Sequence, residues 1–236
     1  MADISSRRSF LAAFGAALIS PRLLGKAEAV PALLDHILLG CSDLESGVRF
    51  IEERLGVRAA FGGVHPGRGT QNALLSLGAR RYLEIIAPDP KQAGTQLSDN
   101  LRGLKAPRLV EWAAHPGNLD QFAARLRSAG IAFEGPQGGS RKRPDGRVLQ
   151  WRTITLKDDG GALPFFIEWG ADSPHPSADA PHGAELLEFA ISGPNPEQLT
   201  SICKSLGLDV SIEQSPNPGL RARVAGRNGR NAILTS

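Results

Sequence analysis

Cysteine is scarce in this 236-residue chain, which contains only two, Cys41 and Cys203. Small domains stapled by disulfides carry a denser set of cysteines, so the sequence excludes that class. The two thiols could pair in an oxidising compartment, but they fall in different predicted modules. We therefore expect two small, buried, apolar side chains.

The chain also lacks an apolar run of membrane-spanning length. The stretch Phe10–Ile19 is apolar but has ten residues, about half of the roughly 20 that a helix needs to cross a bilayer. No second run is long enough either. After removal of the N-terminal segment described below, we expect no stable membrane insertion.

A strong excess of one charge is missing as well. Residues 1–29 carry four of the 27 cations and two of the 24 anions, so the remainder holds 23 and 22, a net charge of +1. Nothing in this balance calls for a nucleic-acid partner. The one dense cationic run, Arg141–Arg143, is interpreted as a solvated hairpin arm or an anion-recognising lid.

Motifs for covalent catalysis and nucleotide binding are absent too. The sequence has no G-x-S-x-G element, and neither cysteine lies in an activated motif. The stretch Gly135–Gly139 lacks the Lys-Ser/Thr pair of a phosphate loop. We therefore expect no nucleotide cofactor.

The first 29 residues have the order of an export signal. An arginine pair, Arg7-Arg8, stands before Ser9-Phe10-Leu11 and the apolar run, and Ala27-Glu28-Ala29 has the small-x-small form of a cleavage site. The segment resembles the twin-arginine consensus. It predicts a mature chain that begins near Val30 and a periplasmic or otherwise exported protein. A Sec signal or an ordinary basic helix are the alternatives.

The rest of the chain repeats one pattern, β-α-β-β-β, three times. Each copy has an apolar strand, a polar helix cap, an amphipathic helix and three further strands. The caps are Asp43, Asn118 and Asn195. The predicted strands are Leu33–Gly40, Val57–Phe61, Ala73–Leu77 and Tyr82–Ala87; Leu109–Ala114, Ile131–Glu134, Leu149–Leu156 and Leu163–Trp169; and Leu186–Ser192, Val210–Gln214, Leu220–Ala225 and Asn231–Thr235.

Independent repetition supports the pattern more strongly than any single strand does. It predicts an α+β fold in which the modules of residues 30–173 form one cupped sheet. A Pro/Ser-rich linker follows at 174–182, and a third module at 183–236. The third module must cover a sheet edge, extend the array or pair with another chain, so a homodimer is one expectation.

Three stretches carry a family resemblance: LDHILLGCSDLE, HPGRGTQNALLSLGARRYLEIIAPDP and LPFFIEWG. Together with the paired modules they resemble the glyoxalase-like domain proteins of the vicinal oxygen chelate superfamily, the glyoxalase, bleomycin-resistance and dioxygenase type. The resemblance implies a cupped sheet with a divalent metal at its mouth. It also implies metal ligands on the first and last strands of each module.

Carried onto this sequence, the resemblance implies a metal site formed by His36, Glu84, Glu111 and Glu168. Such a hard, oxygen-rich set suits Mn²⁺, Mg²⁺ or Fe²⁺ better than Zn²⁺. Glu84 and Glu168 are the catalytic candidates, because a carboxylate beside a Lewis acid can shuttle a proton.

Other interpretations of these residues remain open. His36 could be a core histidine satisfied by Asp35, and Glu84 and Glu168 could pair with nearby arginines. Glu111 faces outward if its strand slips by one residue. The predicted substrate-binding residues are Arg68, Thr70, Asn72 and Trp151.

Two functions follow from the resemblance. One is a metal-dependent lyase or isomerase that acts on a small oxygen-rich molecule. The other is a protein of the same fold that binds or sequesters a small molecule without chemistry.

Overall fold

The computed structural model describes residues 30–143, 145–157 and 162–236. The predicted export signal, residues 1–29, lies outside the described residues. Among the described helices, none is long and apolar enough to cross a membrane.

The first module begins with β1 (Leu34–Gly40) and α1 (Leu44–Leu55). The predicted cap is confirmed, because the Asp43 carboxylate accepts a hydrogen bond from the Ser46 N–H. The helix ends at Gly56, whose φ of 69° suits a residue without a Cβ. Three strands complete the module: β2 (Ala60–His65), β3 (Thr70–Ser76) and β4 (Tyr82–Pro88).

The second module follows a short helix that the sequence pattern missed. This helix, α2 (Gln96–Arg102), is started by a capping box between Thr95 and Ser98. The module itself consists of β5 (Arg108–Ala114), α3 (Leu119–Ser128), β6 (Phe133–Lys142), β7 (Val148–Leu156) and β8 (Phe165–Trp169). Strand β6 is longer than predicted, because residues 137–142 of the Gly-rich and cationic stretch also pair with β7, after a register shift between Glu134 and Gln137.

The third module repeats the same order of elements. A 3₁₀ turn, η1 (Pro176–Ala178), precedes it, and a second one, η2 (Arg227–Gly229), lies within it. The module consists of β9 (Glu185–Gly193), α4 (Pro196–Leu206), β10 (Ser211–Gln214), β11 (Gly219–Ala225) and β12 (Asn231–Thr235).

The first two modules share one curled sheet with the strand order β2-β3-β4-β1-β5-β8-β7-β6. Strand β1 is central, parallel to β4 and antiparallel to β5. The predicted fold class is confirmed: a mixed α+β chain with a cupped sheet from two modules and a separate third one. The third module has its own sheet, β10-β9-β11-β12, in which the middle strand β11, not the last strand, pairs with β9.

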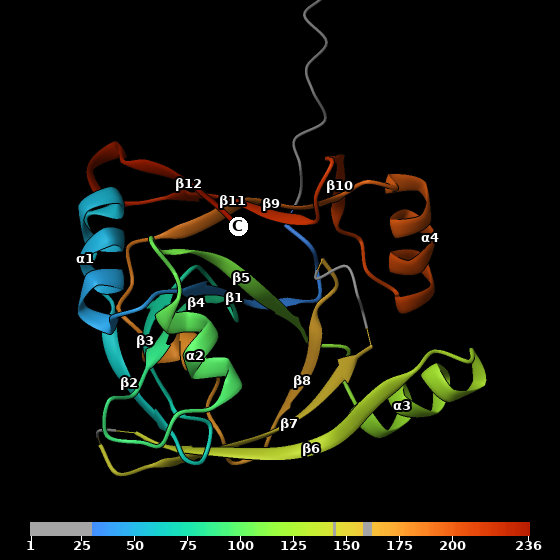
Figure 1. Ribbon diagram of the computed structural model, residues 1–236, viewed down its shortest axis with the longest axis horizontal. Coiled ribbons are helices and arrows are strands. Elements are labelled where there is room, and N and C mark those ends of the chain that lie inside the picture. The colour runs from blue at the N-terminus through green and yellow to red at the C-terminus, as the bar shows by residue number, and fades with distance from the viewer. Residues whose placement is uncertain (1–29, 144, 158–161) are drawn as a thin grey trace, which may run out of the picture.

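The sheet of the third module packs against the back of the large sheet. In Figure 1 it lies across the top of the molecule above β1 and β5, with α1 beside β12. The rings of Trp112 on β5 and Phe189 on β9 are 5.1 Å apart, and both side chains are buried in one core. Cys41 and Cys203 are buried there too and form no disulfide. The concave face of the large sheet is therefore left for a ligand.

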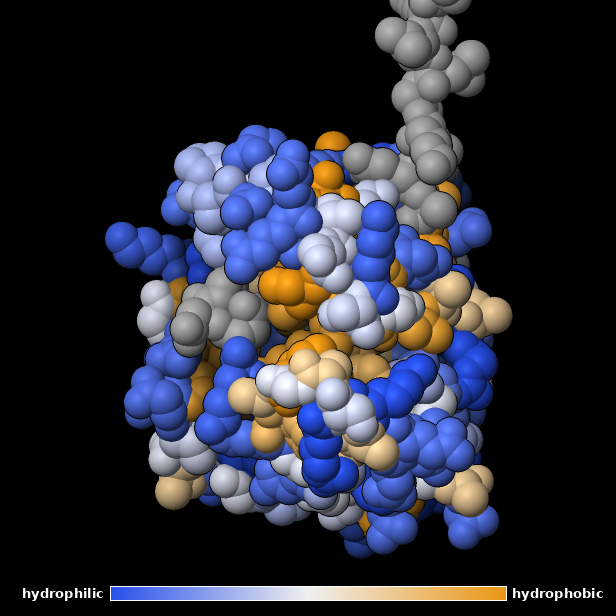
Figure 2. Space-filling view, turned by 90° about the vertical axis from the view of Figure 1, so that its right-hand side faces the viewer, coloured by the Kyte–Doolittle hydropathy of each residue, from blue (hydrophilic) through white to orange (hydrophobic). Residues whose placement is uncertain are grey.

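Part of the outer surface is apolar. On the side shown in Figure 2, hydrophobic residues gather across the middle of the face, with hydrophilic residues above and below. This side carries α4 above and α3 below in Figure 1.

Candidate functional site

A cavity of about 460 Å³ occupies the cup of the large sheet. Alternation along the strands decides which side chains reach it. On β4, Tyr82, Glu84 and Ile86 line the cavity, whereas Leu83 and Ile85 belong to the core on the other face. Helix α2 closes part of the mouth with Leu97, Asn100 and Leu101.

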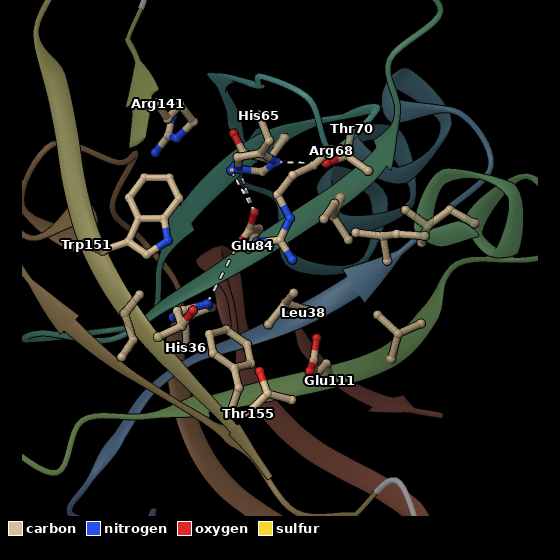
Figure 3. A pocket seen from close by; sticks show the side chains of 18 of the residues that line it. His36, Leu38, His65, Arg68, Thr70, Glu84, Glu111, Arg141, Trp151 and Thr155 are labelled. Atoms are coloured by element: carbon tan, nitrogen blue, oxygen red, sulfur yellow. Dashed lines mark hydrogen bonds and ion pairs between the residues drawn. The ribbon is translucent and has the colours of Figure 1, made fainter. Parts of the chain in front are cut away.

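Glu84 lies at the centre of a buried polar cluster (Figure 3). Its Oε1 accepts a hydrogen bond from the Asn72 amide at 2.7 Å and lies 3.6 Å from His65 Nε2. Its Oε2 lies 3.5 Å from His36 Nε2. Burial raises the pKa of Glu84, but the two imidazoles and the Asn72 hydrogen bond outweigh burial and hold this pKa below its usual range. Glu84 is therefore a carboxylate at neutral pH.

His65, the last residue of β2, was not predicted as a site residue. Its Nδ1 lies 2.9 Å from Thr70 Oγ1, and its Nε2 lies 3.3 Å from the Asn72 amide nitrogen. Burial lowers the pKa of His65, although the carboxylate of Glu84 acts in the opposite direction. Because the Asn72 N–H donates to Nε2, the proton of the neutral ring lies on Nδ1 and is donated to Thr70.

Asn72 and Thr70, both predicted to bind substrate, line the cavity and hold its other polar groups. Asn72 Oδ1 is buried and has no hydrogen-bond partner among the described residues. An unsatisfied buried acceptor is costly, so this atom is available to a donor of a bound ligand.

His36 faces the cavity from β1, and its ring also contacts a carboxylate on the side away from the cavity. Its Nδ1 lies 2.7 Å from the carboxylate of Asp35, and its ring stacks on Tyr82 with centroids 4.4 Å apart. Burial raises the pKa of Asp35, but hydrogen bonds from His175 and His36 bring it well below its usual range. Asp35 is thus a buried anion behind the cavity wall.

Glu111 faces the cavity from β5. A bulge beside it, where Leu38 pairs with Glu111 and Leu39 with Leu109, lets both Val110 and Glu111 reach the lining. The outward orientation considered above is therefore wrong. Burial raises the pKa of Glu111, and no hydrogen bond or ion pair joins it to another residue that the structure describes.

Two arginines bring positive charge to the cavity. Arg141 on β6 is buried, and its guanidinium donates to the carbonyl oxygen of Gly62. Arg68, in the turn between β2 and β3, extends into the cavity (Figure 3), and its charge counteracts the raised pKa of Glu111. Arg141 makes no ion pair within the described part of the chain, so both guanidinium groups can receive an anionic ligand.

Glu168 does not join this cluster. On β8 the inward residues are Phe165, Ile167 and Trp169, so Glu168 points to the other face. There it pairs with Arg152, whose Nε lies 3.2 Å from Glu168 Oε2 and which also binds Asp120 of α3. The predicted convergence of Glu168 with His36 and Glu84 is wrong, because the strand register turns Ile167 inward in its place.

The predicted metal ligands therefore do not fit a shared ion. Glu168 faces away, and the imidazoles of His36 and His65 approach different oxygens of Glu84. Within the described ranges, no group of three or more His, Cys, Asp and Glu side chains is placed to hold a metal ion.

The cavity continues outward into a second hollow between the β2–β3 turn and the β6–β7 arm. Both share His65, Arg68, Trp151, Thr153 and Thr155 in their linings. Trp151, predicted to bind substrate, thus stands where the two hollows meet. The ring of Trp151 packs on Gly139, whereas a Cβ added at Gly138 would meet no atom within 4 Å.

Residues 34–207 match the family described as Glyoxalase-like domain. The chain belongs to this family. The match covers both modules of the cupped sheet and extends into the third module as far as the end of α4. It supports the resemblance to the vicinal oxygen chelate superfamily.

Several solved structures are similar to this chain, and the first described here shows the same fold. A hypothetical protein from Staphylococcus aureus aligns with a TM-score of 0.60 and 16% identity over 85% of this chain and 84% of that one. A methylmalonyl-CoA epimerase from Mycobacterium tuberculosis aligns with a TM-score of 0.45 and 23% identity over 61% of this chain and 91% of that one. A methylmalonyl-CoA epimerase from Streptomyces coelicolor aligns with a TM-score of 0.44 and 20% identity over 57% of this chain and 95% of that one. No curated protein matches the sequence.

Sequence reasoning missed several residues of this glyoxalase-like site. His65 received no predicted role, although its pairing with Thr70 across the β2–β3 hairpin indicates that the two side chains lie close together. Arg141 was assigned to a solvated arm or a lid, but it is buried. The interpretation that Asp35 satisfies His36 is confirmed, whereas no local pattern indicates that His175 also reaches Asp35.

Proposed function

We propose that this glyoxalase-like protein is a lyase or isomerase that moves a proton on a small, anionic, oxygen-rich molecule. One observation carries the proposal: two carboxyl groups face the same cavity from β4 and β5, the strands on either side of β1. Their surroundings drive their pKa values in opposite directions. Such a pair is typical of a general base and a general acid.

The charges assign the roles. Glu84, held as a carboxylate, is suited to accept a proton from a carbon next to a carbonyl group. Glu111, whose carboxyl group is favoured in its neutral form, is suited to donate a proton to the oxygen that gains electron density. Glu84 can then return its proton to the adjoining carbon while Glu111 takes one from the other enediol oxygen, which restores both groups and leaves an isomerised product. Alternatively, a leaving group on the adjoining carbon departs with the proton from Glu84 while the enol oxygen returns its proton to Glu111, which completes a lyase reaction.

The arginines supply binding and orientation. A guanidinium binds a carboxylate with two parallel hydrogen bonds, so Arg68 or Arg141 can fix one end of the substrate. The free acceptor Asn72 Oδ1 can receive a hydroxyl or amide hydrogen from the same molecule. Binding of a divalent metal stays a prediction of the family resemblance, and no step above depends on one.

A second function is favoured by Ile167. An apolar side chain stands at the inward position of β8, where the resemblance implies a metal ligand. A cavity without that ligand suits a protein that binds a small molecule and leaves it unchanged.

Deuterium exchange separates the two functions. The protein would be incubated in D₂O with a panel of small 2-oxo and 2-hydroxy carboxylates, and ¹H NMR would follow loss of the proton on C3, next to the ketone, in the 2-oxo acids and on C2 in the 2-hydroxy acids. We expect exchange with at least one compound, slowed about 100-fold or more by Glu84→Gln. The control Glu45→Gln changes a half-exposed carboxylate on α1 and should exchange normally.

Binding of a compound by titration calorimetry without any exchange would support sequestration instead. Full exchange activity in the Glu84→Gln variant would refute the proposed base.

We further infer that the chain is exported through the twin-arginine pathway, as residues 1–29 suggest. Fused to a reporter, this segment should direct it out of the cytoplasm, and Arg7→Lys with Arg8→Lys should block transport. Export that survives the double substitution would favour a Sec signal.

A further inference from the structure

The segment that joins the second and third modules packs against the back of the candidate site. Within residues 174–182, His175, Pro176 and Ser177 are buried. The carbonyl oxygen of Pro181 accepts a hydrogen bond of 3.0 Å from the Ser76 N–H on β3. The sequence predicts only a linker here, yet this segment places an imidazole beside Asp35.

The hydrogen bonds determine the tautomer of His175. The backbone N–H of Ser177 points at His175 Nδ1 from 3.2 Å, so Nδ1 is an acceptor and carries no proton. The proton of the ring is therefore on Nε2, which lies 3.2 Å from Asp35 Oδ2. His175 is a donor to Asp35.

The Asp35 carboxylate accepts hydrogen bonds from two more donors. The indole N–H of Trp169, at the end of β8, lies 3.2 Å from Asp35 Oδ2, and an indole can only donate. His36 Nδ1 lies 2.7 Å from Asp35 Oδ1. A bulge in the pairing of β1 with β5, between Leu34 and His36, lets the successive residues Asp35 and His36 serve the same cluster.

We propose that His175 and Trp169 are positioning residues: they hold Asp35, and Asp35 keeps the proton of His36 on Nδ1 and turns its Nε2 toward Glu84. The arrangement of these side chains does not depend on the proposed function; only its effect on proton transfer by Glu84 rests on that function. Tyr82 supports the arrangement, since its ring stacks on His36 with an angle of 18° between the planes and meets the edge of His175. The joining segment is thus a functional part of the site.

The proposal can be tested on the resting protein, without a substrate. The chain has five histidines, so protein labelled with ¹⁵N in the imidazoles gives few signals in long-range ¹H–¹⁵N spectra. We expect the His36 proton on Nδ1, exchanging slowly with solvent. His175→Phe keeps an aromatic ring but removes the donor, and should speed this exchange about tenfold or more, with part of the population moving to the Nε2 tautomer.

Three further variants sharpen the result. His175→Gln restores an N–H near the position of Nε2 and should bring the His36 signals back toward those of the unchanged protein. Trp169→Phe removes the other donor and should shift them in the same direction as His175→Phe. The control His182→Phe changes an exposed histidine of the same segment and should leave them unchanged.

A folded His175→Phe variant with unaltered His36 tautomer and exchange rate would overturn the proposal, even if its melting temperature fell. If that variant does not fold, Trp169→Phe decides by the same readout. A Glu84→Gln variant that still exchanges substrate protons, beside a His36 tautomer that does follow His175, would refute the proposed function and leave this inference standing.

Discussion

Replacing Asp35 by Asn gives a direct test of the buried cluster behind the cavity. The substitution keeps the shape of the side chain and removes its charge. Three donors, from His36, His175 and Trp169, converge on the carboxylate at 2.7 to 3.2 Å. The amide can accept some of these hydrogen bonds, but its NH₂ group must then face another donor.

The size of the effect follows from burial. Asp35 is 2% exposed, so water cannot replace a lost partner. A hydrogen bond to a charged group contributes about 1.5–3 kcal/mol, and a buried charged network broken on one side costs about 3–5 kcal/mol. Because Asn retains part of the pattern, we expect a loss of about 3 kcal/mol in unfolding free energy. For a chain of this size that lowers Tm by about 6–12 °C.

The effect must also depend on pH. The pKa of Asp35 is lower in the folded than in the unfolded chain, so its contribution is complete above the unfolded value, near 4, and is lost as pH falls toward the folded one. Urea unfolding followed by circular dichroism at pH 7 and pH 3 measures this. The stability gap between Asp35→Asn and the unchanged protein should narrow at pH 3.

Asp145→Asn is the matched control. This carboxylate is 41% exposed and pairs with Arg147, so its loss should cost less than about 1 kcal/mol. An Asp35→Asn variant within about 0.5 kcal/mol of the unchanged protein, or a gap that is the same at both pH values, would refute the reasoning, since it would mean that the three donors do not stabilise a buried anion.

Further predictions concern the site and the third module. Glu168→Gln should leave proton exchange nearly unchanged in the NMR assay, in contrast to Glu84→Gln, because Glu168 faces away from the cavity; equal losses would contradict the placement of β8. Gln137→Trp should weaken calorimetric binding of long ligands by about tenfold and spare short ones, because Gln137 pairs with the inward-facing Thr153 and lines the outer hollow but not the inner cavity; equal effects on both would show that ligands do not reach the outer hollow. Phe189→Ala should lower the unfolding free energy by about 3–5 kcal/mol, since Phe189 is fully buried against Trp112; a loss below about 1 kcal/mol would mean that the sheet of the third module does not stabilise the cup. Elemental analysis of purified protein should find no stoichiometric divalent metal, because Glu168 faces away and the described residues form no group placed to hold an ion; one metal per chain that is lost in Glu84→Gln would show that the metal chemistry of the family extends to this site.

Local patterns predicted much of the fold. The caps Asp43, Asn118 and Asn195 each accept the hydrogen bond expected of them, because capping involves residues two or three positions apart. The short helix α2 was missed, since seven residues give too little periodicity to recognise. The strand order of the third module was not predictable either, as pairing joins segments far apart in the chain.

For the site, the sequence by itself determined the repeated modules and the residues that they offer: His36 on a first strand, Glu84 on a last strand, and the polar turn with Arg68. Only the tertiary structure decided which side chains meet. Bulges set the orientation of Asp35 and Glu111, and alternation turned Glu168 outward, because a shift of one residue reverses the face on which a side chain lies. His175 reaches Asp35 across 140 positions of sequence, a distance that only folding of the joining segment against the cup can close.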